Sequence, residues 1–332
     1  MLKIFDSTLR DGSHAVKQKL TEEFIEGYCK KADNIGEAAI FVGHGNGLGA
    51  SSIQMGVSDL GEMEMLKIAR KNLHNTKLGG FVTVGFGTIK ECIIPAIDIG
   101  VDLFAIAAHS TEADTLKKHI EFLVKENIPV YGVLMNYHMA TKKQLIDAAK
   151  KIEQYGARGL ILMDSAGASL PHMVKEVYTA LAEHSSLELG FHGHNNLGMA
   201  VSNTYEAINA GATIIDGTIQ GFGSGAGNCQ LESIVAFLKK SNIEVDVNLQ
   251  AMFTTGEYLR NTMQYMQGID PICIMSGMSG VVSTFKTKVI YFSEKYDVNP
   301  YEVFKRLGKR KAIAGQDDLI YEIVCEIKEE KK

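Results

Sequence analysis

The chain has 332 residues and a formal net charge of −5, with 45% hydrophobic and 22% charged residues. This balance is ordinary for a soluble globular protein, and a chain of this length can bury a large core unaided. The sequence carries no basic footprint of the kind that nucleic-acid-binding proteins show, so we expect no nucleic-acid partner.

Short apolar runs alternate with longer amphipathic stretches over the first 240 residues. The predicted strands are 2–7, 38–42, 78–84, 101–107, 129–135, 158–163, 188–193 and 212–217. The predicted helices are 21–35, 61–73, 88–99, 111–126, 141–155, 171–184, 196–210 and 228–239. Thr21 before two glutamates is typical of a helix start, and Pro171 suits a first helical turn. Eight such units predict an α/β fold, a (β/α)8 TIM barrel, with an open doubly wound sheet as the alternative.

The pattern changes after residue 240. The segments 248–267, 285–297 and 300–308 are predicted as helices, and 317–328 as a helix or a short strand. The last residues, 328–332, are predicted as a solvated tail. We therefore predict a catalytic barrel domain over 1–240 and a small, mostly helical C-terminal domain over 241–332. The second domain is expected to cover the active site and to make partner or dimer contacts.

Several features favour a cytoplasmic location. The N-terminus lacks the apolar stretch of a secretory signal, and no segment approaches the roughly 20 apolar residues of a membrane span. The five cysteines show no CxxC spacing, which favours reduced thiols over a disulfide framework. We expect no membrane partner.

Polar residues follow nearly every predicted strand. The carboxyl ends of barrel strands build the active site in this fold, so these segments should meet at one place. They are Asp6–His14, Gly43–Gly47, His109–Glu112, Met135–His138, Asp164–Gly167, His192–Asn196 and Gly221–Asn228.

The clearest metal-binding pattern is the pair His192 and His194. Residues i and i+2 of an extended segment point to the same side, so both imidazoles can face one ion. Asp11, after the first strand, is the best third ligand. Two histidines and a carboxylate suit Mn²⁺, Fe²⁺, Zn²⁺ or Co²⁺ and leave positions open for a substrate. The alternative is a chance pair in which one histidine caps the next helix.

Arg10 and His14 flank Asp11. The planar guanidinium of Arg10 suits a carboxylate or an enolate oxygen, although a structural ion pair is the alternative. His14 is a candidate general base, and its alternative is a surface loop histidine.

Four further features stay open at this point. The glycine-rich segment 221–228 can either cradle a phosphate or form a tight loop close to the metal, and 43–47 invites the same two interpretations. His109 and His138 either support the site or are satisfied polar residues at the barrel mouth.

Together these motifs resemble the DRE-TIM metallolyases, a superfamily that includes hydroxymethylglutaryl-CoA lyase. The segment Asp6–Gly12 (DSTLRDG) is similar to the D-x-T-L-R-D-G signature of that superfamily. The most similar branch is the 4-hydroxy-2-oxovalerate aldolase family, and the similarity covers nearly the whole chain. The further segments that carry it are Thr8–Ala15, Gly43–Leu48, His109–Asp114, His192–Leu197, Gly223–Asn228 and Gly315–Asp318.

The resemblance implies a role for each matching residue. Asp11, His192 and His194 would hold the metal, Mn²⁺ first and Mg²⁺, Co²⁺ or Zn²⁺ as alternatives, with Asn228 close by. Arg10 would stabilise a pyruvate enolate and His14 would be the base for the 4-hydroxyl. Arg10, Ser165 and His192 would contact the substrate.

The implied activity is cleavage or formation of the C3–C4 bond of a 4-hydroxy-2-oxo acid, giving a pyruvate enolate and an aldehyde. Two alternatives are kept: a Claisen-type acyltransferase that condenses acetyl-CoA with a 2-oxo acid, and a non-catalytic metal-binding subunit. The family pairs with an acylating aldehyde dehydrogenase, and Gly315–Asp318 is retained here. Such a partner, and a homo-oligomer or hetero-oligomer, are therefore expected.

The chain departs from the family pattern on the aldehyde side. Val282 stands where the family has a tyrosine that reaches the active site, Asn46 where it usually has Asp, and Tyr137 where Ser is expected. We therefore predict an altered aldehyde specificity, and the Tyr137 hydroxyl is one candidate replacement for the lost phenol.

Overall fold

The computed structural model describes residues 2–264 and 267–330. Its strands are β1 Lys3–Asp6, β2 Ala39–Phe41, β3 Lys77–Thr83, β4 Leu103–His109, β5 Val130–Met135, β6 Gly159–Asp164, β7 Glu188–Gly193 and β8 Ile214–Gly217. The first eight helices are α1 Glu22–Ala32, α2 Glu62–Asn72, α3 Ile94–Ile99, α4 Lys117–Lys125, α5 Lys142–Gln154, α6 Pro171–His184, α7 Ala200–Asn209 and α8 Leu231–Lys240. They are followed by α9 Leu249–Met263, α10 Pro271–Ser279, α11 Lys286–Tyr296, α12 Pro300–Lys309 and α13 Asp318–Glu330.

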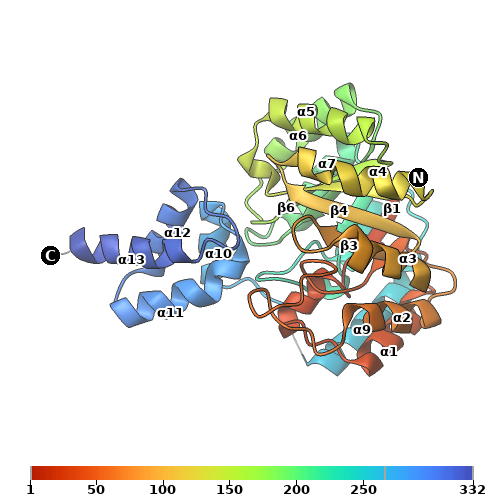
Figure 1. Ribbon diagram of the computed structural model, residues 1–332, viewed down its shortest axis with the longest axis horizontal. Coiled ribbons are helices and arrows are strands. Elements are labelled where there is room, and N and C mark those ends of the chain that lie inside the picture. The colour runs from red at the N-terminus through yellow and green to blue at the C-terminus, as the bar shows by residue number, and fades with distance from the viewer. Residues whose placement is uncertain (1, 265–266, 331–332) are drawn as a thin grey trace.

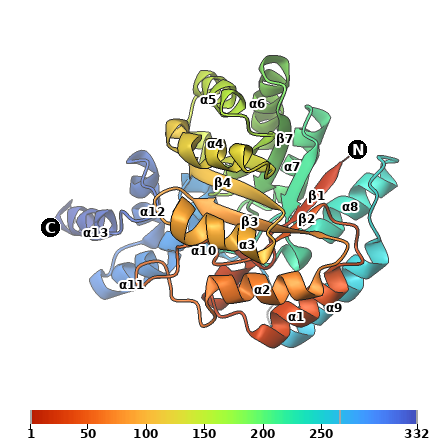
Figure 2. The same cartoon turned by 45° about the vertical axis from the view of Figure 1, so that its right-hand side comes forward.

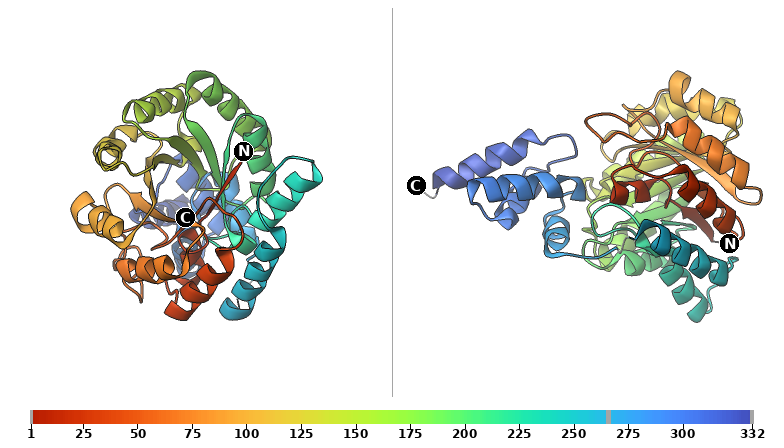
Figure 3. Two further views of the ribbon diagram at one scale, coloured as in Figure 1. Left: turned by 90° about the vertical axis from the view of Figure 1, so that its right-hand side faces the viewer. Right: turned by 90° about the horizontal axis from the view of Figure 1, so that it is seen from below.

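The eight strands form a closed parallel barrel in chain order. Closure is made by β1, which pairs with β2 on one side and with β8 on the other, for example Lys3 with Ile214. Seen along the barrel, the helices form a ring around the strands (Figure 3). The predicted TIM barrel is confirmed, and closure excludes the open doubly wound sheet.

Two apolar layers explain why the strand sequences are almost continuously hydrophobic. One layer fills the barrel interior, where the Phe5 ring meets those of Phe41 and Tyr131 with centroids 5.3 and 5.1 Å apart. The other lies between the strands and the surrounding helices. A strand buried on both faces has no polar side to show, which is typical of parallel sheets.

Local signals set most helix boundaries. The hydroxyl of Thr21 accepts a hydrogen bond from the Phe24 amide at the start of α1, and Pro171 opens α6, as predicted. The predicted helix at 196–210 begins only at Ala200, because the Asn195 side chain accepts from the Ala200 amide and turns the preceding residues out of the helix. The predicted helix at 88–99 starts as a π-helical turn over Ile89–Ile93.

Helix α9 packs against the barrel. Its Tyr258 ring stacks on Phe24 of α1 with centroids 5.9 Å apart, and Met252 and Leu259 belong to the barrel's apolar layer. Figure 2 shows α9 alongside α1 on the outside of the barrel. The prediction of a helix over 248–267 is met by α9, while residues 265 and 266 lie outside the described part of the chain.

Helices α10 to α13 enclose an apolar cluster of their own, formed by residues between Val281 and Ile327. Helix α10 was not predicted, because its apolar residues do not gather on one side. The segment 317–328, predicted as a helix or a short strand, is helical: it forms most of α13, which runs to Glu330. Residues 331 and 332 of the predicted tail lie outside the described residues.

The C-terminal helices stand beyond the carboxyl ends of the barrel strands. Figure 1 shows α10 to α13 on one side of the barrel, with the N-terminus at the far side, and Figure 3 shows the same arrangement from below. None of the helices among the described residues is long and apolar enough to cross a membrane. The cytoplasmic location stays a prediction.

Candidate active site

Asp11, His192 and His194 meet at the carboxyl end of the barrel. One ligand atom from each lies within 4.8 Å of those of the others, and all three residues are buried. His192 lies on β7 and His194 just beyond it, so the i, i+2 spacing places both rings on one side of the strand. This geometry fits a divalent metal ion held by two imidazoles and one carboxylate.

The protonation states favour ligation. Burial lowers the pKa of His194 to about 4, so its ring is neutral near pH 7. Burial alone would raise the pKa of Asp11, but the nearby His194 and Arg10 outweigh it and hold that pKa well below its usual range. A neutral imidazole and a carboxylate are the forms that bind a metal ion.

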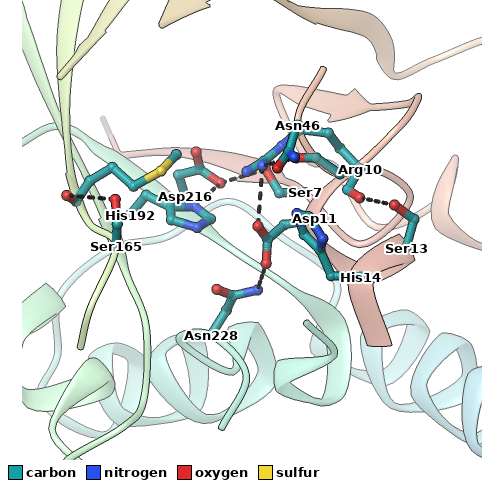
Figure 4. Close-up of polar contacts among 12 residues, drawn as sticks. Ser7, Arg10, Asp11, Ser13, His14, Asn46, Ser165, His192, Asp216 and Asn228 are labelled. Carbon is teal, nitrogen blue, oxygen red and sulfur yellow. Dashed lines mark hydrogen bonds and ion pairs between the residues drawn. The ribbon is translucent and has the colours of Figure 1, made fainter. Parts of the chain in front are cut away.

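Asp216 of β8 supports His192. Its Oδ1 atom lies 3.1 Å from His192 Nδ1, and the Ser7 hydroxyl donates to the same oxygen at 2.8 Å (Figure 4). A carboxylate behind a ligating histidine fixes the ring and raises its basicity. The sequence analysis missed Asp216, although a carboxylate inside an otherwise apolar strand was the available signal.

The glycine-rich loop lies against this cluster. Asn228 donates from Nδ2 to Asp11 Oδ2 at 2.7 Å, while its buried Oδ1 has no hydrogen-bond partner. A Cβ at Gly223 would lie 2.8 Å from the same Asp11 oxygen, so any residue other than glycine would clash with the carboxylate at this position. Of the two predictions for residues 221–228, the geometry fits the tight loop beside the metal site.

Arg10 carries unused hydrogen-bond donors in a buried position. Its Nη1 atom donates to Gly45 O at 3.0 Å and lies 3.2 Å from Asp11 Oδ1, and its guanidinium lies 4.4 Å from the centre of the Phe81 ring. The residue is 2% exposed, yet Nε and Nη2 have no partner. Because buried hydrogen-bond donors without partners are costly, this arrangement calls for an anion that takes both of them.

His14 is held by Gln18, which the sequence analysis missed. The Gln18 Oε1 atom accepts from the Gly45 amide at 2.9 Å, so the amide nitrogen faces His14 and donates to Nδ1 at 2.9 Å. The neutral ring therefore carries its proton on Nε2 in this structure. Burial lowers the pKa of His14, more than Asp11 raises it.

A cavity of about 520 Å³ opens in front of these groups. Among the predicted site residues, Arg10, Asp11, His14, His194 and Ser165 line it. His192 and Asn228 lie behind the lining, with His192 fully buried. The Ser165 hydroxyl accepts from the Asn136 amide at 3.0 Å, which ties β6 to β5 at the rim.

The far wall of the cavity includes the C-terminal segment. Val282 and Gly315 line it, so the position at which the family has tyrosine does face the cavity. Tyr137 does not replace that hydroxyl: its ring is buried in the outer apolar layer and its OH donates to Ser169 at 2.6 Å. His138 is likewise outside the lining, and its Nε2 lies 3.2 Å from Gly280 O, a contact that joins β5 to the C-terminal segment.

Comparison with known sequences gives matches over nearly the whole chain. The HMGL-like family model matches residues 1–259, and the DmpG-like communication domain model matches residues 267–329. The 4-hydroxy-2-oxovalerate aldolase of Spirochaeta aurantia is 44% identical over 326 residues, which cover 98% of this chain and 96% of that protein. The protein of the same name from Pectobacterium atrosepticum is 42% identical over 323 residues, which cover 97% and 94%.

Solved structures share the fold at lower identity. The N-terminal domain of a putative aldolase from Bacteroides vulgatus is 22% identical with a TM-score of 0.76, covering 89% of this chain and 98% of that one. The carboxyl transferase domain of Rhizobium etli pyruvate carboxylase is 15% identical with a TM-score of 0.81, covering 99% of this chain and 60% of that one. At these identities the likeness concerns the fold alone.

Proposed function

The chain belongs to the HMGL-like family, among relatives named 4-hydroxy-2-oxovalerate aldolase, and on that premise we propose that it is a divalent-metal-dependent aldolase. It would cleave or form the C3–C4 bond of a 4-hydroxy-2-oxo acid, with pyruvate as the 2-oxo product. The observation that carries this proposal is the buried Arg10, whose two free donors lie beside a three-residue metal cluster.

Asp11, His192 and His194 would hold the metal ion, with Asn228 Oδ1 as a further ligand. Mn²⁺ is our choice over Mg²⁺, Co²⁺ and Zn²⁺ because the family resemblance implies it; two imidazoles and a carboxylate suit several of these ions. A bound ion would supply a Lewis acid that stabilises negative charge on the 2-oxygen of the substrate.

Arg10 would bind the substrate carboxylate through Nε and Nη2, which match the spacing of two carboxylate oxygens. The same cation would stabilise the negative charge that develops on the enolate as the C3–C4 bond breaks. A preorganised donor at such a point contributes about 2.7–4 kcal/mol to lowering the barrier in other enzymes. Ser165 on the cavity wall and His192 behind it would contact or align the 2-oxo acid.

His14 would be the general base in the cleavage direction. It takes the proton of the 4-hydroxyl, the C4 oxygen becomes the aldehyde carbonyl, and the electron pair of the C3–C4 bond passes to the pyruvate enolate. A base needs a free lone pair, whereas Nε2 carries the proton while Gln18 donates to Nδ1. We therefore propose that, when substrate binds, the ring loses its proton from Nε2 and takes one up on Nδ1, while the Gln18 amide turns over so that its oxygen accepts from Nδ1–H.

The acyltransferase alternative is not favoured, because the relatives that match over the full chain are named aldolases. The third hypothesis, a non-catalytic metal-binding subunit, gives no reason for the unpaired donors of Arg10.

We propose that α10 to α13, with their separate apolar cluster, form the unit that contacts an acylating aldehyde dehydrogenase. Because α9 packs on α1, the domain division would lie between α9 and α10 rather than at residue 240. Gly315 lines the cavity and Asp317 pairs with Lys288, so the segment 315–318 links the cavity to this unit. The oligomeric state, whether homo-oligomer or hetero-oligomer, stays a prediction.

The test is turnover of 4-hydroxy-2-oxovalerate, with pyruvate measured by lactate dehydrogenase and NADH. We expect activity only after a divalent ion is restored to chelator-treated protein, with Mn²⁺ the most effective. A parallel assay with acetyl-CoA and a 2-oxo acid should release no free thiol. Metal binding without turnover of any 4-hydroxy-2-oxo acid would instead support the non-catalytic hypothesis.

A further inference from the structure

The cavity has a second polar wall that the proposed chemistry does not use. In the closed strand order, β4 lies across the barrel from β8, and β5 lies across from β1. His109 ends β4, and Asn136 follows β5; both line the cavity. The strand register pairs His109 with Met135, so His109 and Asn136 are close neighbours on this wall.

His109 offers a hydrogen-bond donor. The Thr111 amide donates to its Nδ1 at 3.4 Å, and the Thr111 hydroxyl lies 2.8 Å from the same atom. A neutral ring with Nδ1 as acceptor carries its proton on Nε2. That Nε2 atom is buried and has no hydrogen-bond partner.

Asn136 offers an acceptor. The residue is 7% exposed, and its Oδ1 is buried without a hydrogen-bond partner. Its backbone is fixed on both sides, since its amide donates to Ser165 Oγ at 3.0 Å and its carbonyl accepts from Ser110 Oγ at 3.1 Å. Its left-handed conformation (φ 50°) is one that asparagine tolerates better than most residues.

The charges on this wall disfavour an anion. Among the described residues that line the cavity, Arg10 is the only lysine or arginine, and it belongs to the β1 side. Glu112, just beyond His109, lines the cavity on the opposite side. A group that meets both a donor and an acceptor without a charge is a hydroxyl, because it accepts one hydrogen bond and donates another.

We propose that His109 and Asn136 form a hydroxyl-binding subsite, and that the aldehyde handled by this enzyme is a small, neutral 2-hydroxyaldehyde. This inference rests on the proposed aldolase function. An alkyl chain at the same place would leave both polar atoms without a hydrogen-bond partner, whereas a hydroxyl would satisfy both. Val282, which also lines the cavity, adds no polar group, so the discrimination comes from the residues at the ends of β4 and β5.

The experiment compares kcat/KM for addition of pyruvate to glycolaldehyde and to propionaldehyde, which differ by a hydroxyl in place of a methyl group. Succinic semialdehyde is the anionic comparison. The wild-type protein should prefer glycolaldehyde over propionaldehyde by roughly tenfold or more. His109→Leu should bring this ratio close to one, and His109→Gln, which keeps a donor, should restore much of it. Met135→Leu, an apolar change on the same wall, is the matched control and should leave the ratio unchanged.

Metal-dependent exchange of the pyruvate methyl protons is measured in parallel on every variant. Exchange in all variants, combined with a wild-type preference for propionaldehyde or succinic semialdehyde, would overturn the subsite and leave the proposed function standing. An unchanged ratio in His109→Leu would overturn the subsite in the same way. Absence of exchange in the wild type would overturn the proposed function, and the subsite with it.

Discussion

The two sides of the cavity are built differently. We call Arg10, Asp11, His192 and His194 the enolate wall, and His109, Asn136 and Val282 the acceptor wall. Arg10 and Asp11 follow β1, and His192 and His194 lie at the end of β7. Each of three contacts holds one of them in place: Arg10 donates to the Gly45 carbonyl, Asp11 accepts from Asn228, and His192 lies against Asp216. The acceptor wall joins β4 and β5 to a loop from the C-terminal helices, and its unpaired atoms, His109 Nε2 and Asn136 Oδ1, belong to neutral side chains.

This contrast separates chemistry from specificity. A wall whose ligands are fixed by a second set of contacts can hold a metal ion and an oxyanion in one geometry, as catalysis requires. The acceptor wall instead offers one neutral donor and one neutral acceptor, which can choose between aldehydes but cannot hold a metal ion or an oxyanion. Changes to the enolate wall should therefore abolish turnover, whereas changes to the acceptor wall should alter which aldehyde is used.

The largest expected effect comes from Asp11→Asn. The amide has nearly the same shape but removes the anionic ligand, so we expect metal affinity to fall by at least about 100-fold and turnover to be lost with it. Isothermal titration with Mn²⁺ measures the affinity, and circular dichroism checks the fold. Unchanged affinity in a folded variant would remove Asp11 from the metal site.

Arg10→Lys should lower kcat by about 10²–10³ while leaving Mn²⁺ affinity within roughly threefold of the wild type. Lysine keeps the charge but cannot bridge two carboxylate oxygens as the guanidinium fork does. Steady-state kinetics and metal titration on the same preparation separate the two effects. A wild-type kcat would show that the free donors of Arg10 are not used.

A smaller loss of metal affinity is expected for substitution of Asp216, which contacts His192 but does not line the cavity. Asp216→Asn should weaken Mn²⁺ binding by about 10–100-fold, because His192 loses the carboxylate that orients and polarises its ring. Ser7→Ala, which removes only the hydrogen bond to Asp216, is the graded control and should cost less. Equal losses in the two variants would point to a packing defect instead.

The smallest effect concerns pH. The proposed cleavage needs a neutral His14, and burial lowers the pKa of that ring from its usual 6.5, so the wild-type rate should fall only at pH values below 6.5. Gln18→Glu places a carboxylate against Nδ1, which favours the protonated ring and should move this acid limb to higher pH by roughly one unit. The pH profile of kcat/KM reports the shift. A profile that does not move would separate Gln18 from the base.

The difference between the walls also marks what the sequence could predict. The barrel followed from alternating apolar runs and amphipathic stretches, and the enolate wall from residues adjacent in sequence, Arg10 with Asp11 and the i, i+2 histidines. Asp216 and Gln18 were missed because their partners are set by strand register and by the folding of a loop. The pairing of Tyr137 with Ser169, which removes its hydroxyl from the cavity, could not be foreseen for the same reason.

Helix α10 shows the same limit in the fold. Its apolar residues serve different neighbours, so no single hydrophobic face marks it in the sequence. The acceptor wall depends on how the loop after α10 returns to the barrel mouth, where His138 lies against Gly280, and a single sequence carries no signal for that contact.

The most direct test of the enolate wall is exchange of the pyruvate methyl protons in D₂O, followed by NMR after the metal has been removed with a chelator. Wild-type protein loaded with Mn²⁺ should exchange these protons, metal-free protein should not, and Arg10→Ala should be slower by about 100-fold or more. Exchange in the wild type that depends on both the metal and Arg10 would establish enolate formation at this wall. Metal-loaded protein that leaves pyruvate unexchanged would contradict it.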